Sequence, residues 1–422
     1  MKSPVTVAPE DLDFSRLLRE GDAVGWAEAT AEPALLTRLL DRQAERCPPF
    51  RVFFALTFAT DFRPDHPNVT VTALGGASAG RRFFAAGAAN VIPANISGLC
   101  DLIAAGRPRI DVVLLQVTGP DPAGNYNAGV GIECLREMIA GARLVIAQVN
   151  PLLPWTEGDT LIEPGLIDIL VPASHPVLEV PARTIGPVEE AIAVHVARLV
   201  PDRATVELGI GQIPEAVARA LGGKRGLGLH SGAIGDGVAD LIEAGIIDNR
   251  HKEIDEGVTV ATMLMGTRLL YDFAEHNPKI HIRSPRYTHD ALVLGNFRRF
   301  VAINGALEID LTGQVNAETS GGHHVGVVGG QMDFVRAANR AAEGRSVIAL
   351  PSTSRDRTQS RIVARLADSV VTTPRAEADC VVTEHGIAEL KGRTLAERAR
   401  ALIAISDPAF RFALERDVSR LL

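Results

Sequence analysis

The feature that most constrains the fold of this chain is a series of short, unbroken apolar runs that alternate with segments of helical period. The runs include "VVLLQV", "RLVIAQV", "ATVEL" and "SVIAL", and each is followed within two residues by Gly, Pro or Asn. Strands of a parallel sheet have this composition because helices bury both of their faces. The sequence therefore predicts an α/β fold with mainly parallel sheets covered by helices.

Length and one internal loop predict two domains. The chain of 422 residues is longer than an ordinary domain of roughly 100–200 residues, and its 46% hydrophobic content can fill two cores. In "TIGPVEEAIAVHVARLVPDRATVELGIG", a Pro-marked loop leads into an amphipathic helix, a new strand and a glycine turn. The predicted boundary lies at Ile185, which gives domains 1–184 and 185–422.

Charge and hydropathy exclude several classes of partner. The net charge is −8, and no run of Lys and Arg resembles a nucleic-acid patch. No apolar run reaches the roughly 18 residues of a membrane span, and the N-terminal stretch lacks the apolar core of a signal peptide. We expect a soluble cytoplasmic protein that binds neither nucleic acid nor membranes.

The four cysteines predict neither a disulfide framework nor a metal site. Cys47, Cys100, Cys134 and Cys380 are widely spaced, with no CxxC pair and no His at the spacing of a zinc site. They are expected to be reduced core residues, and no metal is expected.

Two glycine-rich turns are candidate anion sites. In "VELGIGQIPEAV", Gly209 and Gly211 follow a strand, and Pro214 lies in the first turn of the next helix, where free amides and the helix dipole favour an anion. This turn lacks the third glycine of the dinucleotide fingerprint, so an ordinary strand-to-helix turn is the alternative. In "SGGHHVGVVGGQMDF", successive amides can form an anion-binding nest or an oxyanion hole, and a surface turn is the alternative.

Candidate catalytic side chains lie in and near these turns. His323 and His324 are candidate bases; because no Asp, Glu or Cys stands at ligand spacing, the alternative is that both are solvated. In "GLHSGAIGDG", Ser231 is a candidate nucleophile if a base lies within reach. His230 is the neighbouring candidate, although on an extended backbone it points away from the serine.

Several long motifs follow one another along nearly the whole chain. They are "QVTGPDPAGNYNAGVG", "VIAQVNPLLPWTEGDTLI", "GIGQIPEAV", "MLMGTRLLYDF", "VVGGQMDFVRAA" and "VVTEHGIAELKGRTLAERA". Together they resemble the acetyl-CoA hydrolase/transferase family, the branch of CoA-transferases that includes 4-hydroxybutyrate and succinyl-CoA:acetate enzymes. The resemblance implies two open α/β domains of the CoA-transferase type, an acyl-CoA substrate bound largely by the second domain, no covalently bound cofactor, and a homodimer.

The resemblance also implies a mechanism and a set of binding positions. In the family a Glu carboxylate attacks the thioester, and a glutamyl-CoA intermediate then passes CoA to an acceptor acid. The implied CoA- or substrate-binding residues are Gly209, Gly211, Gln212, Ala233, Asn304, Val327, Gly329, Gly330 and Gln331.

The sequence departs from the family pattern at the nucleophile. The family has a stretch like "HTEMxxDG", whereas this chain reads "HSGAIGDG", so Gly232 stands where the resemblance requires the catalytic Glu. Ala233 replaces the bulky residue that usually follows, which predicts a cavity, and Val327 replaces a glycine of the family's "SGxGGQ" loop. Glycine has no group that attacks a thioester, and losing a covalent nucleophile lowers turnover by up to ~10⁶-fold in a protease.

Three functions remain compatible with these residues. In the first, the protein binds an acyl-CoA, and water or a second substrate attacks the thioester directly in the space beside Gly232. Glycine-loop amides would stabilise the oxyanion, with His230 or the histidine pair as base. In the second, the protein is a non-catalytic acyl-CoA binder or a partner subunit. In the third, it is a CoA-transferase whose carboxylate has moved, with Glu308 and Glu318 as nominees.

Overall fold

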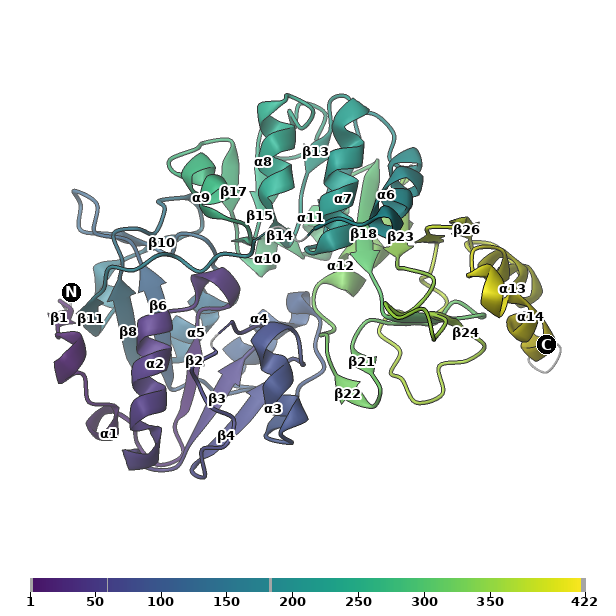
Figure 1. Cartoon of the computed structure of the whole chain (residues 1–422). Helices are drawn as coiled ribbons and strands as arrows, with labels where there is room; N and C mark the ends of the chain where they lie inside the picture. The colour runs from purple at the N-terminus through teal and green to yellow at the C-terminus, as the bar shows by residue number, and fades with distance from the viewer. Residues whose placement is uncertain (1–2, 59, 182–183, 419–422) are drawn as a thin grey trace. The chain divides into compact units, whose positions relative to one another are not determined.

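The chain folds into two compact units, and each contains segments that are far apart in the sequence (Figure 1). The computed structural model describes residues 3–58, 60–181 and 184–418. Unit 1 consists of Met1–Val180, Ala261–Tyr287 and His323–Gly329, and unit 2 consists of Pro181–Val260, Thr288–Gly322 and Gly330–Leu422. The domains 1–184 and 185–422 drawn from the sequence stay a prediction.

Unit 1 is built on an eight-stranded sheet in which every neighbouring pair of strands is parallel. Across the sheet the strands are β1 (Val5–Thr6), β11 (Ile169–Pro172), β8 (Leu144–Val149), β6 (Val112–Val117), β2 (Ala23–Trp26), β3 (Phe50–Phe54), β4 (Val69–Ala73) and β5 (Ala89–Val91). The run "VVLLQV" is β6, and all of its residues are buried. A central strand covered on both faces requires this composition.

The helices of unit 1 pack their apolar sides against this sheet. Leu36 and Leu40 of α2 belong to the same buried cluster as Val24 and Val112 of the strands. The helices are α1 (Phe14–Leu17), α2 (Ala34–Gln43), α3 (Arg81–Ala85), α4 (Ile96–Ala104), α5 (Leu135–Gly141) and α9 (Arg268–Ala274). Short strand pairs are β7 (Tyr126–Asn127) with β10 (Leu161–Ile162) and β9 (Glu157–Gly158) with β17 (Ile280–Ile282).

Unit 2 is built on a six-stranded sheet that is parallel except at its last pair. Across the sheet the strands are β13 (Gly228–Leu229), β12 (Thr205–Leu208), β18 (Phe300–Gly305), β23 (Arg345–Ala349), β25 (Cys380–Thr383) and β26 (Gly386–Glu389). A smaller sheet joins β20 (Val315–Asn316), β19 (Glu308–Asp310) and β24 (Ile362–Val363). The α/β fold with mainly parallel sheets is thus confirmed.

The helices of unit 2 include both of those expected beside its glycine turns. "PEAVARA" lies within α7, and "GVADLIE" lies within α8. The helices are α6 (Pro187–Leu199), α7 (Gln212–Ala220), α8 (Asp236–Glu243), α11 (Ala291–Leu294), α12 (Gln331–Arg340), α13 (Leu395–Ala404) and α14 (Pro408–Val418). Phe334 of α12 packs with Phe300 of β18 and with Phe297 in one buried cluster. The candidate site described in the next subsection lies against this cluster.

The cysteines differ from the sequence prediction. Cys100 in α4 and Cys134, the residue before α5, form a disulfide, so the expectation of four reduced cysteines is wrong for this pair. Cys47 and Cys380 are free and buried, as expected of core residues. The two bonded cysteines are 34 positions apart, and the packing of α4 against α5 brings them together. Spacing along the sequence carries no signal for such a contact.

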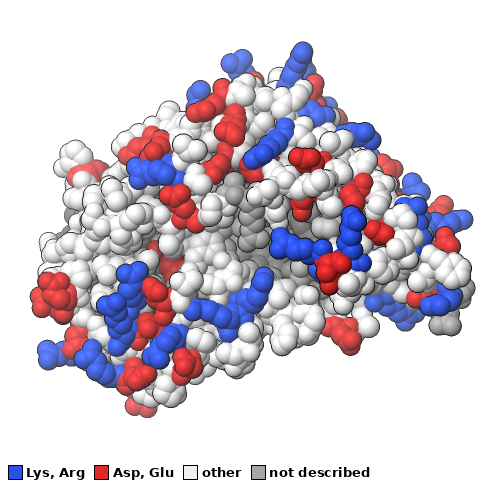
Figure 2. All heavy atoms as spheres, in the orientation of Figure 1, with Lys and Arg blue, Asp and Glu red and all other residues white. Residues whose placement is uncertain are grey.

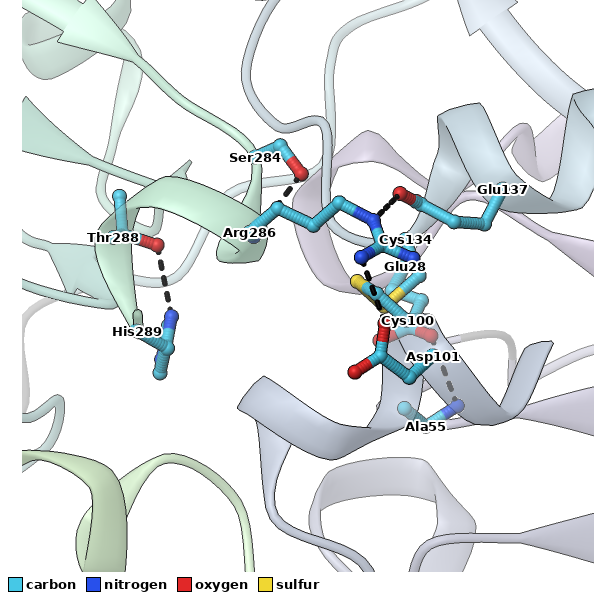
Figure 3. Close-up of a disulfide and its surroundings, with 10 residues drawn as sticks. All are labelled: Glu28, Ala55, Cys100, Asp101, Cys134, Glu137, Ser284, Arg286, Thr288 and His289. Carbon is cyan, nitrogen blue, oxygen red and sulfur yellow. Dashed lines mark hydrogen bonds and ion pairs between the residues drawn. A yellow bond between two sulfur atoms is a disulfide. The ribbon is translucent and has the colours of Figure 1, made fainter. Parts of the chain in front are cut away.

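An ion-pair bridge lies beside the disulfide (Figure 3). Arg286 donates to Asp101 of α4 at 2.7 Å and to Glu137 of α5 at 2.5 Å. Within the described ranges, Cys100, Cys134 and Glu137 are the one group of three metal-ligating side chains whose ligand atoms lie within 4.8 Å of one another. Sulfur atoms in a disulfide lack the thiolate charge that binds zinc, so this set does not fit a metal.

Thiol titration is expected to count two reactive thiols in the unreduced, denatured protein and four after reduction. In the native protein both free thiols should react slowly, because burial raises the pKa of Cys47 to about 11 and that of Cys380 to about 12. The thiolate is the reactive form. A Cys100→Ser variant is the control, since it releases Cys134 and raises the unreduced count by one. Four thiols in the unreduced wild type would contradict the disulfide.

The helices and the surface bear on the partners expected from the sequence. In the part of the chain that is described, no helix is both long and apolar enough to cross a membrane. On the face shown in Figure 2, acidic and basic side chains are interspersed. The cytoplasmic location, the homodimer and the lack of a nucleic-acid partner stay predictions.

Candidate functional site

The first glycine turn has the strand–turn–helix form that the sequence predicts. It joins the end of β12 to α7, and Gly211 is the N-cap of that helix with a φ of +118° that a side chain would strain. A Cβ at Gly211 would meet nothing within 4 Å, so the backbone there is open to a ligand. Gly209 is half-buried, and the Gln212 side chain donates to the Thr184 carbonyl at 2.7 Å. Amides at this helix N-terminus suit an anion.

Ser231 has contacts that differ from those of an activated nucleophile. Its side chain is fully buried, and its hydroxyl donates to the carbonyl oxygens of Leu208 at 2.8 Å and Ala233 at 3.0 Å. An activated serine needs a hydrogen bond to a base, and here the hydroxyl bonds to carbonyls instead. The serine therefore fixes the backbone on both sides of Gly232.

His230 is also fully buried and fixes the same stretch. Its Nε2–H donates to the Thr288 carbonyl at 2.9 Å, and its ring packs edge-on against Phe297 at 5.1 Å between ring centroids. The backbone amide of Ser231 donates to the carbonyl of Val260 at 3.0 Å. These contacts tie the predicted nucleophile loop to the aromatic cluster.

A histidine that the sequence analysis did not single out lies in the space beside Gly232. A Cβ added at Gly232 would lie 3.2 Å from Nε2 of His289 and 3.4 Å from its Cε1. A Cβ added at Gly330, the N-cap of α12, would lie 2.5 Å from the same Nε2. Both glycines therefore converge on one imidazole nitrogen, and the cavity predicted beside Gly232 is occupied in part by a ring.

The ring of His289 is held firmly. Its Nδ1 lies 2.8 Å from Oγ1 of Thr288, the last residue of α10 (Pro285–Thr288), as Figure 3 shows. Its ring centroid lies 4.7 Å from that of Phe334. The residue is only 4% exposed, and burial lowers the pKa of His289 to about 3, so the imidazole is neutral at pH 7. Among the described residues Nε2 has no hydrogen-bond partner.

Asn304 is joined to a second residue that the sequence analysis missed. Its Nδ2 donates at 2.7 Å to Oε2 of Glu207, which also accepts from the amide of Ile303 at 3.2 Å. Glu207 lies in β12, two residues before Gly209, and is 3% exposed. Burial raises the pKa of this carboxyl to about 8, against the hydrogen bonds from Asn304 and Ile303 that lower it.

Glu207→Gln is expected to make stability less dependent on pH between about 4.5 and 8. The raised pKa means that the folded protein keeps a proton that the unfolded chain releases, so the wild type loses stability as pH rises through this window. The free energy of unfolding of the variant, relative to that of the wild type, should increase with pH by at most roughly 4–5 kcal/mol up to pH 8.

Urea unfolding of both proteins at several pH values measures this difference, with Glu20→Gln at an exposed position as the control. A difference that does not change with pH would contradict the buried, protonated carboxyl.

The second glycine loop is divided between the two units. Gly329, with a φ of +61°, belongs to unit 1, where its carbonyl accepts from the amide of Ile96 at the start of α4, at 3.1 Å. Val327 is half-buried in the same unit. Gln331 begins α12 in unit 2, and its side chain donates to Oγ1 of Thr373 at 3.0 Å. Gly330 is the one glycine of this loop that contacts His289.

The histidine pair belongs to unit 1, whereas Gly232 and His289 belong to unit 2. His323 is exposed, and the ring of His324 packs against Phe84 at 5.3 Å between centroids. The group formed by Gly232, Gly330 and His289 within unit 2 therefore does not include either of them.

The two nominees for a relocated carboxylate already have hydrogen-bond partners. Glu308 accepts from the side chains of Asn316 at 3.2 Å and Ser369 at 2.8 Å. Glu318 is 6% exposed and accepts from the Thr372 hydroxyl at 2.8 Å. These bonds fit carboxylates that stabilise the loops of the smaller sheet.

One of the two missed residues had a usable signal in the sequence. Glu207 is the single charged residue in the run "ATVEL", and a charge in a strand buried on both faces needs an explanation. His289 had none, since "YTHDA" matches no motif and lies far along the chain from Gly232.

Two units, each built on a mainly parallel sheet with glycine turns at strand ends, define the class of protein as α/β. Comparison with protein families is more specific. Residues 11–179 match the acetyl-CoA hydrolase/transferase N-terminal domain, and residues 266–418 match the C-terminal domain. The chain belongs to the acetyl-CoA hydrolase/transferase family, as its motifs indicated.

Relatives and solved structures agree with this assignment. The chain is 44% identical over 315 residues to 4-hydroxybutyrate coenzyme A transferase of Clostridium kluyveri, covering 74% of this chain and 73% of that protein. The structure of RipA from Yersinia pestis matches with a TM-score of 0.93 at 31% identity, over 99% of this chain and 97% of that one. A 4-hydroxybutyrate CoA-transferase from Porphyromonas gingivalis matches with a TM-score of 0.83 at 32% identity, over 99% and 98% of the two chains.

Proposed function

We propose that this protein binds an acyl-CoA and catalyses direct attack of water on the thioester, without a covalent intermediate on the enzyme. The observation that carries the proposal is the side chain that faces Gly232, which is the neutral imidazole of His289 and not a carboxylate. Membership of a family of CoA-transferases and acetyl-CoA hydrolases supports an acyl-CoA substrate.

The carboxylates of unit 2 argue against the double-displacement route of CoA transfer. Glu308 and Glu318 are hydrogen-bonded within the smaller sheet and its loops. Glu207 is the buried carboxyl nearest in sequence to the first glycine turn, but with a pKa of about 8 it is mostly protonated at neutral pH. A protonated carboxyl is a poor nucleophile, so none of these three residues is proposed to take over the role of the missing Glu.

The glycines of the two turns and of the nucleophile position are proposed to have different roles in binding. The open backbone at Gly211, which follows Gly209 in the turn, suits a phosphate of CoA because it lies at a helix N-terminus. The absence of side chains at Gly232 and Gly330 leaves Nε2 of His289 uncovered, and the acyl thioester is proposed to bind against this nitrogen. Ala233, Asn304 and Gln331 complete the proposed binding set within unit 2.

Release of free CoA thiol from acetyl-, propionyl- and longer acyl-CoA tests the proposal. Each thioester is incubated with the protein alone and with added carboxylate, amine or alcohol acceptors. Release without any acceptor is expected. Release that requires a carboxylate, with an adduct trapped by hydroxylamine or borohydride, would overturn the proposal in favour of CoA transfer. Binding of acyl-CoA without release would mean a non-catalytic binder or partner subunit.

A further inference from the structure

We propose that His289 is a catalytic residue whose Nε2–H donates a hydrogen bond to the thioester oxygen and stabilises the oxyanion formed when water attacks. This inference rests on the proposed function. It adds the residue that gives the largest electrostatic stabilisation of the oxyanion. The sequence analysis assigned that task to glycine-loop amides, and no motif pointed to this histidine.

The two glycines leave Nε2 of His289 uncovered by side chains. An ideal Cβ atom at Gly330 would lie 2.5 Å from Nε2 and one at Gly232 would lie 3.2 Å from it, so a side chain at either position would press on this nitrogen. Because both residues are glycine, no side chain at these positions keeps a hydrogen-bond acceptor from Nε2. A carbonyl oxygen that reaches the ring meets a nitrogen that no described side chain has already bonded.

The contact on the other side of the ring is compatible with a proton on Nε2. Oγ1 of Thr288 lies 2.8 Å from Nδ1, and we assign the hydroxyl as the donor in this bond. Nδ1 then accepts, and the proton of the neutral ring is on Nε2. The carbonyl of the same threonine accepts from His230, so the chain segment that presents the ring is fixed at two points.

The protonation state of the ring decides between two catalytic roles. A general base works best when its pKa is near the operating pH, whereas burial lowers the pKa of His289 to about 3. A histidine that stays neutral donates a hydrogen bond to a carbonyl without first losing or gaining a proton. The ring is largely buried beside Phe334, which limits the water that competes for that bond.

The proposed step balances as a hydrolysis. The oxygen of water forms a bond to the thioester carbon, and the π electrons of the carbonyl move to its oxygen, which accepts from Nε2–H. When the oxyanion collapses, the carbon–sulfur bond breaks, and its electron pair leaves with sulfur. The proton lost by the attacking water is balanced by the proton that the thiolate takes from solvent. The products are a carboxylic acid and CoA thiol, and His289 ends in its starting tautomer.

Three variants separate a donor from a base. In His289→Gln the amide nitrogen reaches the position of Nε2 and donates without being basic, so kcat for thiol release should remain within about tenfold of the wild type. His289→Leu lacks a donor, and kcat should fall roughly 100- to 1,000-fold with a small change in KM. His276→Gln, at a histidine whose side chain is 66% exposed, is the matched control. Equal losses in the Gln and Leu variants would overturn the donor role.

Two further readouts do not depend on hydrolysis. The first is the ¹⁵N NMR spectrum of the wild type, in which the proton of His289 should be on Nε2 at pH 6–8; a proton on Nδ1 would overturn the proposal. The second is binding of an inert ketone analogue of acetyl-CoA in which CH₂ replaces sulfur. His289→Leu should weaken this analogue about tenfold and leave the affinity for CoA unchanged.

These results separate the two proposals. If the wild type releases no thiol but His289→Leu binds the ketone analogue more weakly than the wild type does, hydrolysis is rejected and the hydrogen-bond donor role of His289 is retained. Equal analogue affinity in His289→Leu and the wild type would reject the donor whatever the hydrolase result.

Discussion

A double variant, Gly232→Glu with His289→Asn, is expected to acquire carboxylate-dependent CoA transfer that neither single variant shows. The family resemblance places a catalytic Glu at this position, but its Cβ would lie 3.2 Å from Nε2 and 3.4 Å from Cε1 of His289. Such contacts crowd a ring that packs against Phe334. Asn ends near the position of Nδ1, so it vacates both crowding atoms.

The rate of CoA transfer by the double variant should be at least about 100-fold above that of either single variant. A large increase is expected because loss of a covalent nucleophile lowers turnover by up to ~10⁶-fold. The assay follows transfer of CoA from acetyl-CoA to propionate or butyrate, and hydroxylamine or borohydride traps the glutamyl-CoA intermediate. Gly222→Glu with His276→Asn is the control, since a Cβ at Gly222 meets nothing within 4 Å. No transfer by a double variant that folds and binds CoA would mean that the site has diverged beyond these two positions.

Gly330→Ala is expected to lower both stability and thiol release, even though it adds a single methyl group. The new Cβ would lie 2.5 Å from Nε2 and 2.7 Å from Cδ2 of His289, and 3.2 Å from a ring carbon of Phe334. The imidazole cannot easily move away, because Nδ1 is bonded to Thr288 and the ring is buried. Overpacking of this kind destabilises by about 1–3 kcal/mol, and displacing a catalytic group by 1 Å can lower activity about 100-fold.

Urea unfolding and the thiol-release assay measure the two effects of Gly330→Ala on the same preparation. Gly222→Ala is the matched control, because its Cβ has open space and its φ is not positive. If Gly330→Ala is as stable and as active as this control, the statement that the two glycines closely confine the ring of His289 is wrong.

Most of the architecture could be predicted from the sequence because the relevant signals are local. The run "VVLLQV" is the buried strand β6, and the first four residues of "SVIAL" lie in β23. The helices beside the glycine turns, α7 and α8, also lie where their apolar period and Pro214 placed them. Each of these signals depends on residues within about one turn or one strand.

The contents of the site could be predicted only in part. Gly209 and Gly211 have a local signature, which is a strand followed by a turn and a helix, and the structure has that form. Ser231 and His230 looked like catalytic groups because their chemistry is visible in the sequence. Both side chains are buried because they hydrogen-bond to the carbonyls of Thr288 and Leu208, which lie in segments distant in the chain.

The sequence by itself determined the α/β class, the family and the glycine at position 232, because periodicity, motif order and residue identity are all written along the chain. Only the tertiary structure decided that His289 fills the space beside Gly232, that Glu207 is a buried carboxyl, and that Cys100 pairs with Cys134. The physical reason is that contacts, burial and pKa values depend on which distant segments pack together, and no spacing within one segment specifies that packing.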